Sequence, residues 1–374
     1  GLLPATAWAA GETVPSNITL AGTVLGSGKS YIATESGITE KPDDSDETNY
    51  LTYADGVLTV YGTVEVSCGE SAGLSFYSGT LTLAGNGDLT IAASGSNIAV
   101  SGSPQSTLTT AEGFSGSITL GSVYAPAVQN VVLDLTTGGD IQISSAENSA
   151  VNTPQNPVAL AGKTVTLKGA VETAEASPAN VSAVTAPKLN VTAEDGVTIT
   201  GSSGYLTLIA DDSNNECAVT LNAGGDVAIV NQSGMAVYGP LTVESAHNVT
   251  IAGGGTSLLY SANGVHCINA SGTVKMESSG IVCSGNDANG LTITGAETVD
   301  IAGESAAAPV VTGMTLNKCG AATVTRLEYT DTMAPIACTV TSDIPVLLRN
   351  GSHDIEPQLL WDGESYQKAA VEDV

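Results

Sequence analysis

Basic residues are scarce in this sequence of 374 residues. Only ten lysines and arginines stand against 38 aspartates and glutamates, giving a formal net charge of −28 and a pI near 4.1. A nucleic-acid-binding protein needs a basic surface that displaces counterions, so this balance excludes DNA and RNA as partners. An anionic membrane surface would repel the chain for the same reason. Neutral glycans, cations and other proteins remain as partner classes.

Aromatic residues and long apolar runs are also rare. The chain holds 15 aromatic residues against 43 glycines, yet 42% of its residues are hydrophobic, which argues against overall disorder. No run of 18 apolar residues follows the N-terminus, so no membrane-inserted segment is expected. Residues 1–10 resemble the end of a signal peptide, with Ala7 and Ala9 in an A-x-A spacing, and this predicts a secreted or cell-wall-associated protein. An ordinary apolar start is the alternative.

The cysteines lack the spacing of a metal site. None of the six forms a C-x-x-C pair, and histidine occurs only three times, which excludes the usual zinc motifs. Cys217, Cys267 and Cys319 are almost equally spaced, so we expect them to recur at one position in every second repeat. Strands two repeats apart are about 9.6 Å apart, which exceeds the reach of a disulfide. The spacing therefore predicts buried free thiols.

A four-point apolar pattern recurs along the chain. Its form is L-x-L-x5-V-x-I, with apolar residues at offsets 0, 2, 8 and 10, and it begins at residues 81, 133, 189, 219, 241 and 291. Apolar residues two positions apart point to one face of a short strand. Asp88, Asp140, Gly196, Asp226 and Asn248 precede the second strand and suit a tight corner. Each unit thus predicts two short strands that face a common interior.

The repeat length predicts the fold. Coils of about 22 to 30 residues explain the spacings, and no helical period is visible in any long window. Short strands at this period are typical of a parallel β-helix, an all-β solenoid, here of roughly 10–12 coils with capped ends. An antiparallel sandwich array or a propeller is the alternative. We assign residues 11–57 to N-terminal strands and a cap, 58–339 to the β-helix and 340–374 to a C-terminal cap or linker.

Several segments resemble a family of bacterial surface proteins. The sequences YADGVLTV at residues 53–60, GTLTLAGNGDLTI at 79–91, NGVHCINASGTV at 263–274 and NGLTITGA at 289–296 carry this resemblance. They are similar to surface solenoids of gut Gram-positive bacteria of the "carbohydrate-binding domain-containing" type. The resemblance covers about residues 50 to 330. It implies a pectin-lyase-like right-handed β-helix, an extracellular location and a glycan-binding or adhesive role, and it supplies no site residues.

Carboxylates are the first candidates for catalysis, because β-helices host polysaccharide lyases and hydrolases. Asp211 and Asp212 form a paired carboxylate with Glu216 close in sequence, as a hydrolase would require for acid and base. A solvated loop is the alternative for the pair. A lyase needs basic residues, and the only arginines are Arg326 and Arg349, near the C-terminal end.

Acidic residues also suggest a cation site. Asp43, Asp44, Asp46 and Glu47 offer oxygen ligands for a hard cation such as Ca²⁺, with a plain acidic loop as the alternative. The G-G-D segments that end at Asp140 and Asp226 lack the tandem calcium-binding pattern and are expected at corners. No cofactor is otherwise implied.

Tyrosines are the candidates for ligand binding. Tyr205, Tyr238 and Tyr260 recur at intervals near one coil each, so their rings could form a stripe that stacks on sugars. Individual tyrosines covering coil edges are the alternative. His266 is expected to face solvent, because Glu216 and Lys318 occupy its apparent repeat equivalents.

These observations favour a non-catalytic extracellular β-helix that binds glycans or adheres to a host or bacterial surface protein. The alternatives are a glycan-active hydrolase or lyase and a passive structural stalk.

Overall fold

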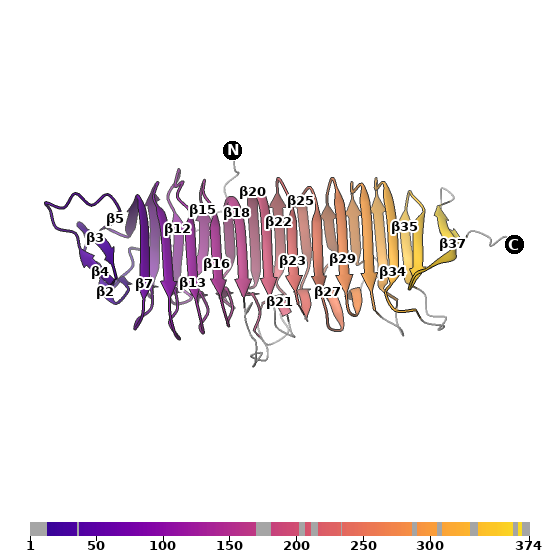
Figure 1. Ribbon diagram of the computed structural model, residues 1–374, viewed down its shortest axis with the longest axis horizontal. Helices are drawn as coiled ribbons and strands as arrows, with labels where there is room; N and C mark the ends of the chain where they lie inside the picture. Colours follow the sequence, from indigo (N-terminus) through magenta and orange to yellow (C-terminus); the bar gives the residue numbers. More distant parts are fainter. Residues whose placement is uncertain are drawn as a thin grey trace.

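The chain forms a β-solenoid of about 10 turns in the computed structural model (Figure 1). The structure describes residues 13–35, 37–169, 181–201, 206–210, 216–232, 234–285, 290–304, 309–329, 336–361 and 366–368. Within these residues every regular element is a strand, and most strands pair in parallel with the strand one turn away. The fold class predicted by the apolar repeat is confirmed.

Each turn contributes a strand to three faces. The first face contains β6 (Val57–Tyr61), β9 (Gly79–Gly85), β12 (Ser106–Thr110), β15 (Val132–Thr136), the start of β18 (Val158–Gly169) and of β20 (Lys188–Gly201), β22 (Ala218–Ala223), β25 (Leu241–Ser245), β28 (His266–Asn269), β31 (Leu291–Thr294), and the ends of β33 (Val311–Asn317) and β35 (Ala337–Ser342).

The second face follows a corner of a few residues. It contains β7 (Thr63–Cys68), β10 (Asp88–Ala93), β13 (Ile118–Ser122), β16 (Ile141–Ser145), the ends of β18 and β20, β23 (Val227–Asn231), β26 (Val249–Gly253), β29 (Thr273–Ser278), β32 (Thr298–Gly303), β34 (Ala321–Arg326) and β36 (Val346–Asn350).

The third face has the shortest strands. It contains β8 (Leu74–Ser75), β11 (Val100–Ser101), β14 (Val128–Gln129), β17 (Val151–Asn152), β19 (Val184–Thr185), β21 (Leu206–Ile209), β24 (Met235–Tyr238), β27 (Ser257–Ser261), β30 (Ile281–Gly285), and the first residues of β33 and β35.

The repeated apolar residues form the core. All positions of the six matches to the repeat pattern are buried, with at most 2% of their surface exposed. On the second face, one inward ladder runs through Val64, Leu89, Ile118, Ile141, Val165, Val197, Val227, Val249, Val274, Val299, Ala322 and Val346. The step from Val165 to Val197 is slightly longer than the repeat length expected from the sequence, and the other steps fall within the expected range.

Polar side chains hold the corner between the first and second faces. The Asp140 Oδ1 atom accepts hydrogen bonds from the backbone nitrogen and the hydroxyl of Thr164, one turn away, at 3.1 and 2.8 Å. Asp226 Oδ1 accepts in the same way from the backbone and side-chain nitrogens of Asn248, at 3.1 and 3.0 Å. Asn248 Oδ1 then accepts from the backbone nitrogen of Thr273 at 2.8 Å. These acceptors satisfy corner amides that the strands do not pair.

Antiparallel strands cover the N-terminal end on two of the three faces. The first face continues from β6 into β5 (Tyr50–Ala54), β3 (Lys29–Thr34) and β4 (Gly37–Glu40). On the third face, β1 (Thr19–Leu20) pairs with β8 and with β2 (Thr23–Val24). This cap lies beyond one end of the stack (Figure 1), and covered edges suppress end-to-end association.

The C-terminal end also changes from parallel to antiparallel pairing. β37 (His353–Trp361) pairs antiparallel with β36 and with β38 (Tyr366–Lys368). Among the described residues no helix is long and apolar enough to cross a membrane.

Candidate functional site

Glu216 links two turns across the turn between them, at the corner before the first face. Its carboxylate accepts hydrogen bonds from the Ser261 hydroxyl at 3.2 Å and from the backbone nitrogen of Ala262. These partners lie 45 and 46 residues away, two turns along the solenoid. The intervening turn carries Gly239 with φ +138°, where an added Cβ would lie 2.2 Å from the Cys217 carbonyl oxygen. The Glu216 carboxylate therefore bonds to a turn two steps away, and Asp211 and Asp212 lie outside the described residues.

Two of the three predicted tyrosines form a pair on the third face. Tyr238 and Tyr260 are register partners in β24 and β27, and their ring centroids are 5.2 Å apart at an interplanar angle of 38°. Both residues are half-buried. Ile209 aligns with this position one turn earlier and Ser284 one turn later, so the aromatic strip is two turns long. Tyr205 lies outside the described residues.

The tyrosine pair adjoins the Glu216 contacts. Tyr260 directly precedes Ser261, whose hydroxyl donates to Glu216, and the Cys217 backbone nitrogen donates to the Tyr238 carbonyl at 2.9 Å. The Gly239 backbone nitrogen continues this ladder to the Tyr260 carbonyl at 2.8 Å. The backbone that carries both rings is thus held by hydrogen bonds between neighbouring turns. We call this group, Glu216, Tyr238, Tyr260 and Ser261, the tyrosine corner.

His266 is buried, so the prediction that it faces solvent is wrong. Only 1% of its surface is exposed, and it aligns with Leu241 and Leu291 in an inward ladder of the first face. Its Nδ1 atom accepts a hydrogen bond from the Leu241 backbone nitrogen at 3.3 Å. Burial lowers the pKa of His266 to about 4, although the nearby Glu216 charge opposes this shift. The imidazole is therefore neutral at pH 7 and fills a place that other turns give to aliphatic residues.

The cysteines are free but do not share one position. No disulfide joins Cys68, Cys217, Cys267, Cys283 or Cys319, the cysteines whose side chains the structure describes. Cys267 aligns with Thr242 in an outward position and is only half-buried, whereas Cys217 precedes the first-face strand and is buried. The predicted alignment every second repeat is thus wrong, because the intervening turns differ in length. Burial raises the pKa of Cys217 and of Cys283 to about 12.

The acidic loop of the cap does not gather its carboxylates. Asp43, Asp44, Asp46 and Glu47 are exposed. In the part of the chain that the structure describes, no three acidic, histidine or cysteine residues lie together in a group suited to a metal ion. Glu47 instead accepts a hydrogen bond from the Asn49 backbone nitrogen at 2.9 Å.

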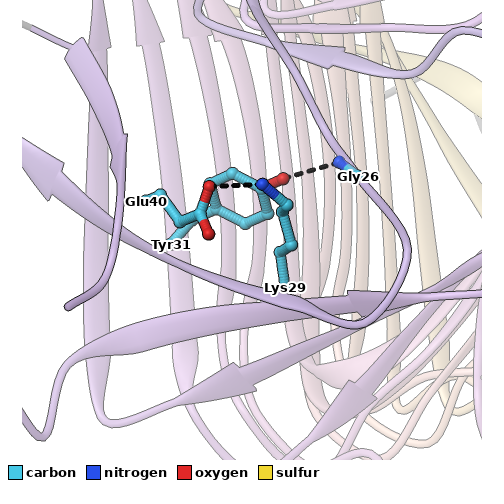
Figure 2. A network of polar contacts seen from close by, with 4 residues as sticks. All are labelled: Gly26, Lys29, Tyr31 and Glu40. Carbon is cyan, nitrogen blue, oxygen red and sulfur yellow. Dashed lines mark hydrogen bonds and ion pairs between the residues drawn. The ribbon is translucent and has the colours of Figure 1, made fainter. Parts of the chain in front are cut away.

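The cap around this loop is held by local polar contacts. Lys29 Nζ lies 2.6 Å from Glu40 Oε2 on the neighbouring strand, and the Tyr31 hydroxyl accepts from the Gly26 nitrogen at 2.6 Å (Figure 2). These contacts join β3 to β4 and to the turn that precedes β3. They fix the cap strands that face the start of the solenoid.

A serine–histidine pair that the sequence analysis missed lies on another corner. His247 Nδ1 and Ser271 Oγ are 3.2 Å apart in a shallow depression of about 280 Å³. The backbone amides of Ser271 and Gly272 already donate to carbonyls of the preceding turn, at 3.1 and 2.7 Å. They are not free to stabilise an oxyanion, as acyl transfer would require. The pair is a surface hydrogen bond between turns.

A groove lies between the cap and the first turn of the solenoid. It has a volume of about 620 Å³ and is lined by β7, by the end of β3 and by the acidic loop. Glu35, Glu47 and Glu65 line its walls, and all three are exposed. No basic side chain is among the lining residues, so the groove is strongly negative.

Comparison with known proteins adds no relative. No family model, curated protein or solved structure matches this chain.

Proposed function

We propose that this solenoid is a non-catalytic extracellular binding protein that recognises neutral glycans through the tyrosine corner. The observation that carries the proposal is the aligned pair of Tyr238 and Tyr260 rings, 5.2 Å apart on adjacent turns. Aromatic faces offer apolar contact to the C–H faces of sugar rings, while the phenol hydroxyls provide polar contacts at the rim. The resemblance to carbohydrate-binding surface solenoids of gut bacteria agrees with this chemistry.

The charge of the protein restricts the ligand. A net charge of −28 disfavours anionic polysaccharides such as polyuronates, which the long-range field would repel. Neutral polysaccharides pay no such penalty. The same argument weakens the alternative of a lyase that acts on uronates.

Affinity gel electrophoresis through a panel of neutral and acidic polysaccharides tests the proposal. We expect one or more neutral glycans to retard the protein and the Tyr238→Ala and Tyr260→Ala variants each to bind about fivefold to tenfold more weakly. Tyr→Phe changes at both positions keep the rings and should retain most binding.

Exposed tyrosines elsewhere provide the controls. Tyr77 and Tyr124, with 62% and 55% of their surface exposed, lie away from the pair in sequence and register. Their Ala variants should migrate like the parent protein. Equal retardation of all variants would place the binding surface elsewhere, a cleared zone in the gel would indicate hydrolysis, and no retardation in any gel would favour a stalk.

A further inference from the structure

The first strand of the second face has one unpaired edge. β7 pairs with β10 on one side, and no strand pairs with its other side among the described residues. The cap supplies antiparallel partners to the first face through β5 and to the third face through β1, but it supplies none to β7. β7 lies at the cap end of the stack, next to the cap strands (Figure 1). The groove of about 620 Å³ lies along this edge.

The hydrogen-bond pattern identifies which backbone groups face the groove. The backbone nitrogens of Asp88 and Ser94 donate to the carbonyls of Gly62 and Cys68. The amides and carbonyls of the even-numbered residues of β7 therefore point towards β10. Successive residues of a strand direct their backbone groups to opposite edges of the strand, both groups of one residue to the same edge. The amides and carbonyls of the odd-numbered residues of β7 therefore point towards the groove. The nitrogen of the first of these, Thr63, donates to the Asn49 side-chain oxygen at 2.9 Å. The backbone groups of Glu65 and Ser67 have no partner in the described structure.

The side chains around this edge define the charge of an occupant. Val64 and Val66 point into the core with 1% exposure, whereas the Glu65 side chain is exposed. Glu35 and Glu47 line the facing wall. An incoming strand would place a side chain opposite Glu65, where a basic residue is favoured and an acidic one is repelled. A second copy of this chain, with its net charge of −28, is disfavoured for the same reason.

We propose that the β7 edge binds an extended basic peptide segment of another protein by β-strand addition. Main-chain hydrogen bonds to Glu65 and Ser67 supply the strand pairing, and lysine or arginine side chains meet Glu35, Glu47 and Glu65. The six residues of β7 accommodate a strand of about 20 Å. This site is separate from the tyrosine corner and does not depend on glycan binding.

A labelled peptide of alternating lysine and valine, six residues long, is the probe, with binding followed by fluorescence anisotropy at low salt. We expect saturable binding to the full chain. The Glu35→Gln, Glu47→Gln and Glu65→Gln triple variant should bind roughly tenfold more weakly, since three exposed ion pairs are lost. Asp300→Asn is the charge control for Glu65→Gln alone, because Asp300 occupies the ladder position of Glu65 in a turn whose two edges are both paired.

Strand pairing is tested separately from charge. Ser67→Pro removes an amide that faces the groove and leaves the bonds to β10 in place, so the fold should persist while peptide affinity falls at least about fivefold. A lysine–valine peptide of equal charge whose backbone amides are all N-methylated cannot donate strand hydrogen bonds in either orientation and should bind poorly. Far-UV circular dichroism and thermal melting confirm that each variant is folded.

Other outcomes would overturn the assignment. Equal binding of both peptides, or an affinity unchanged by Ser67→Pro, would mean nonspecific adsorption to an acidic surface. No binding of the lysine–valine peptide at millimolar concentration would reject the site. Concentration-dependent dimerisation that Ser67→Pro abolishes would identify a second copy as the occupant instead.

Discussion

Replacing His266 by leucine should change how the stability of the solenoid depends on pH. In the folded protein the pKa of this imidazole is lowered to about 4, whereas an unfolded chain protonates histidine at about 6.5. The folded state binds the proton less readily than the unfolded chain does. His266 therefore does not change the free energy of unfolding above pH 6.5 and lowers it as the pH falls from 6.5 towards 4. Each pKa unit corresponds to about 1.4 kcal/mol, which gives a loss of about 3 kcal/mol at pH 4.

The His266→Leu variant should lack this loss. Leucine continues the aliphatic ladder of Leu241 and Leu291, but the Leu241 amide then loses its acceptor, at a cost of about 1–2 kcal/mol that does not vary with pH. Urea unfolding of the parent and the variant between pH 7 and pH 4 measures the difference. Carboxylates titrate in both proteins, so only the divergence of the two curves reports on His266.

A direct titration and a control variant complete the experiment. The chain has only three histidines, so imidazole signals in ¹³C-labelled protein can be assigned by substitution. We expect the His266 signal to keep the chemical shift of a neutral imidazole down to about pH 4. The control variant is His247→Leu, at an exposed position, which should leave the pH dependence of the unfolding free energy unchanged. A His266 signal that titrates near 6.5, or parallel stability curves for the parent and His266→Leu, would refute the reasoning.

Three further predictions concern the core and its corners. Gly116→Ala should destabilise the protein by about 3 kcal/mol in urea unfolding, because the new Cβ would lie 1.8 Å from the Gly87 carbonyl oxygen, whereas Gly121→Ala, with nothing within 4 Å, should be tolerated. Iodoacetamide at pH 8 should modify the native protein at half-buried Cys267 before buried Cys217. Mass spectrometry of peptides gives the order of modification, and simultaneous labelling would contradict the difference in burial. Asp140→Ala should lower the melting temperature through the loss of about 1 kcal/mol of corner hydrogen bonding, and Asp140→Asn, which keeps the acceptor, should restore most of it.

The sequence pattern predicts the solenoid because two of the three faces bury strictly alternating residues. Some turns do not match the four-point apolar pattern, and the structure shows why. The step from Leu108 to Ile118 is longer than the pattern allows and that from Val158 to Val165 is shorter, because the corner between the faces varies in length. In a third turn the first apolar position is His266. The third face cannot be recognised in the sequence, because several of its strands have only two residues, and two residues cannot show an alternation of apolar and polar positions.

The tyrosine pair is predictable because its spacing equals one turn, but the Glu216 contacts are not. A carboxylate that reaches 46 residues forward depends on the lengths of two turns, and these lengths vary along the chain. Equal spacing is also misleading for this reason: Cys217 and Cys267 are spaced almost as Cys267 and Cys319 are, and nevertheless face different environments. Burial of a polar residue such as His266 leaves no periodic signal at all.

The two proposed surfaces follow from how a solenoid uses its backbone. In the interior turns, parallel pairing on both sides consumes the amides and carbonyls, so a ligand there meets side chains, as at the tyrosine corner. Only an end of the stack can leave a row of backbone groups open, as along β7. Ring stacking on a neutral sugar changes little with ionic strength, whereas a basic peptide facing three glutamates should bind several-fold more weakly at about 0.5 M salt than at about 0.05 M, because exposed charge pairs are screened. A glycan interaction as sensitive to salt as the peptide interaction would indicate that both ligands are held by charge, and would contradict the assignment of the tyrosine corner.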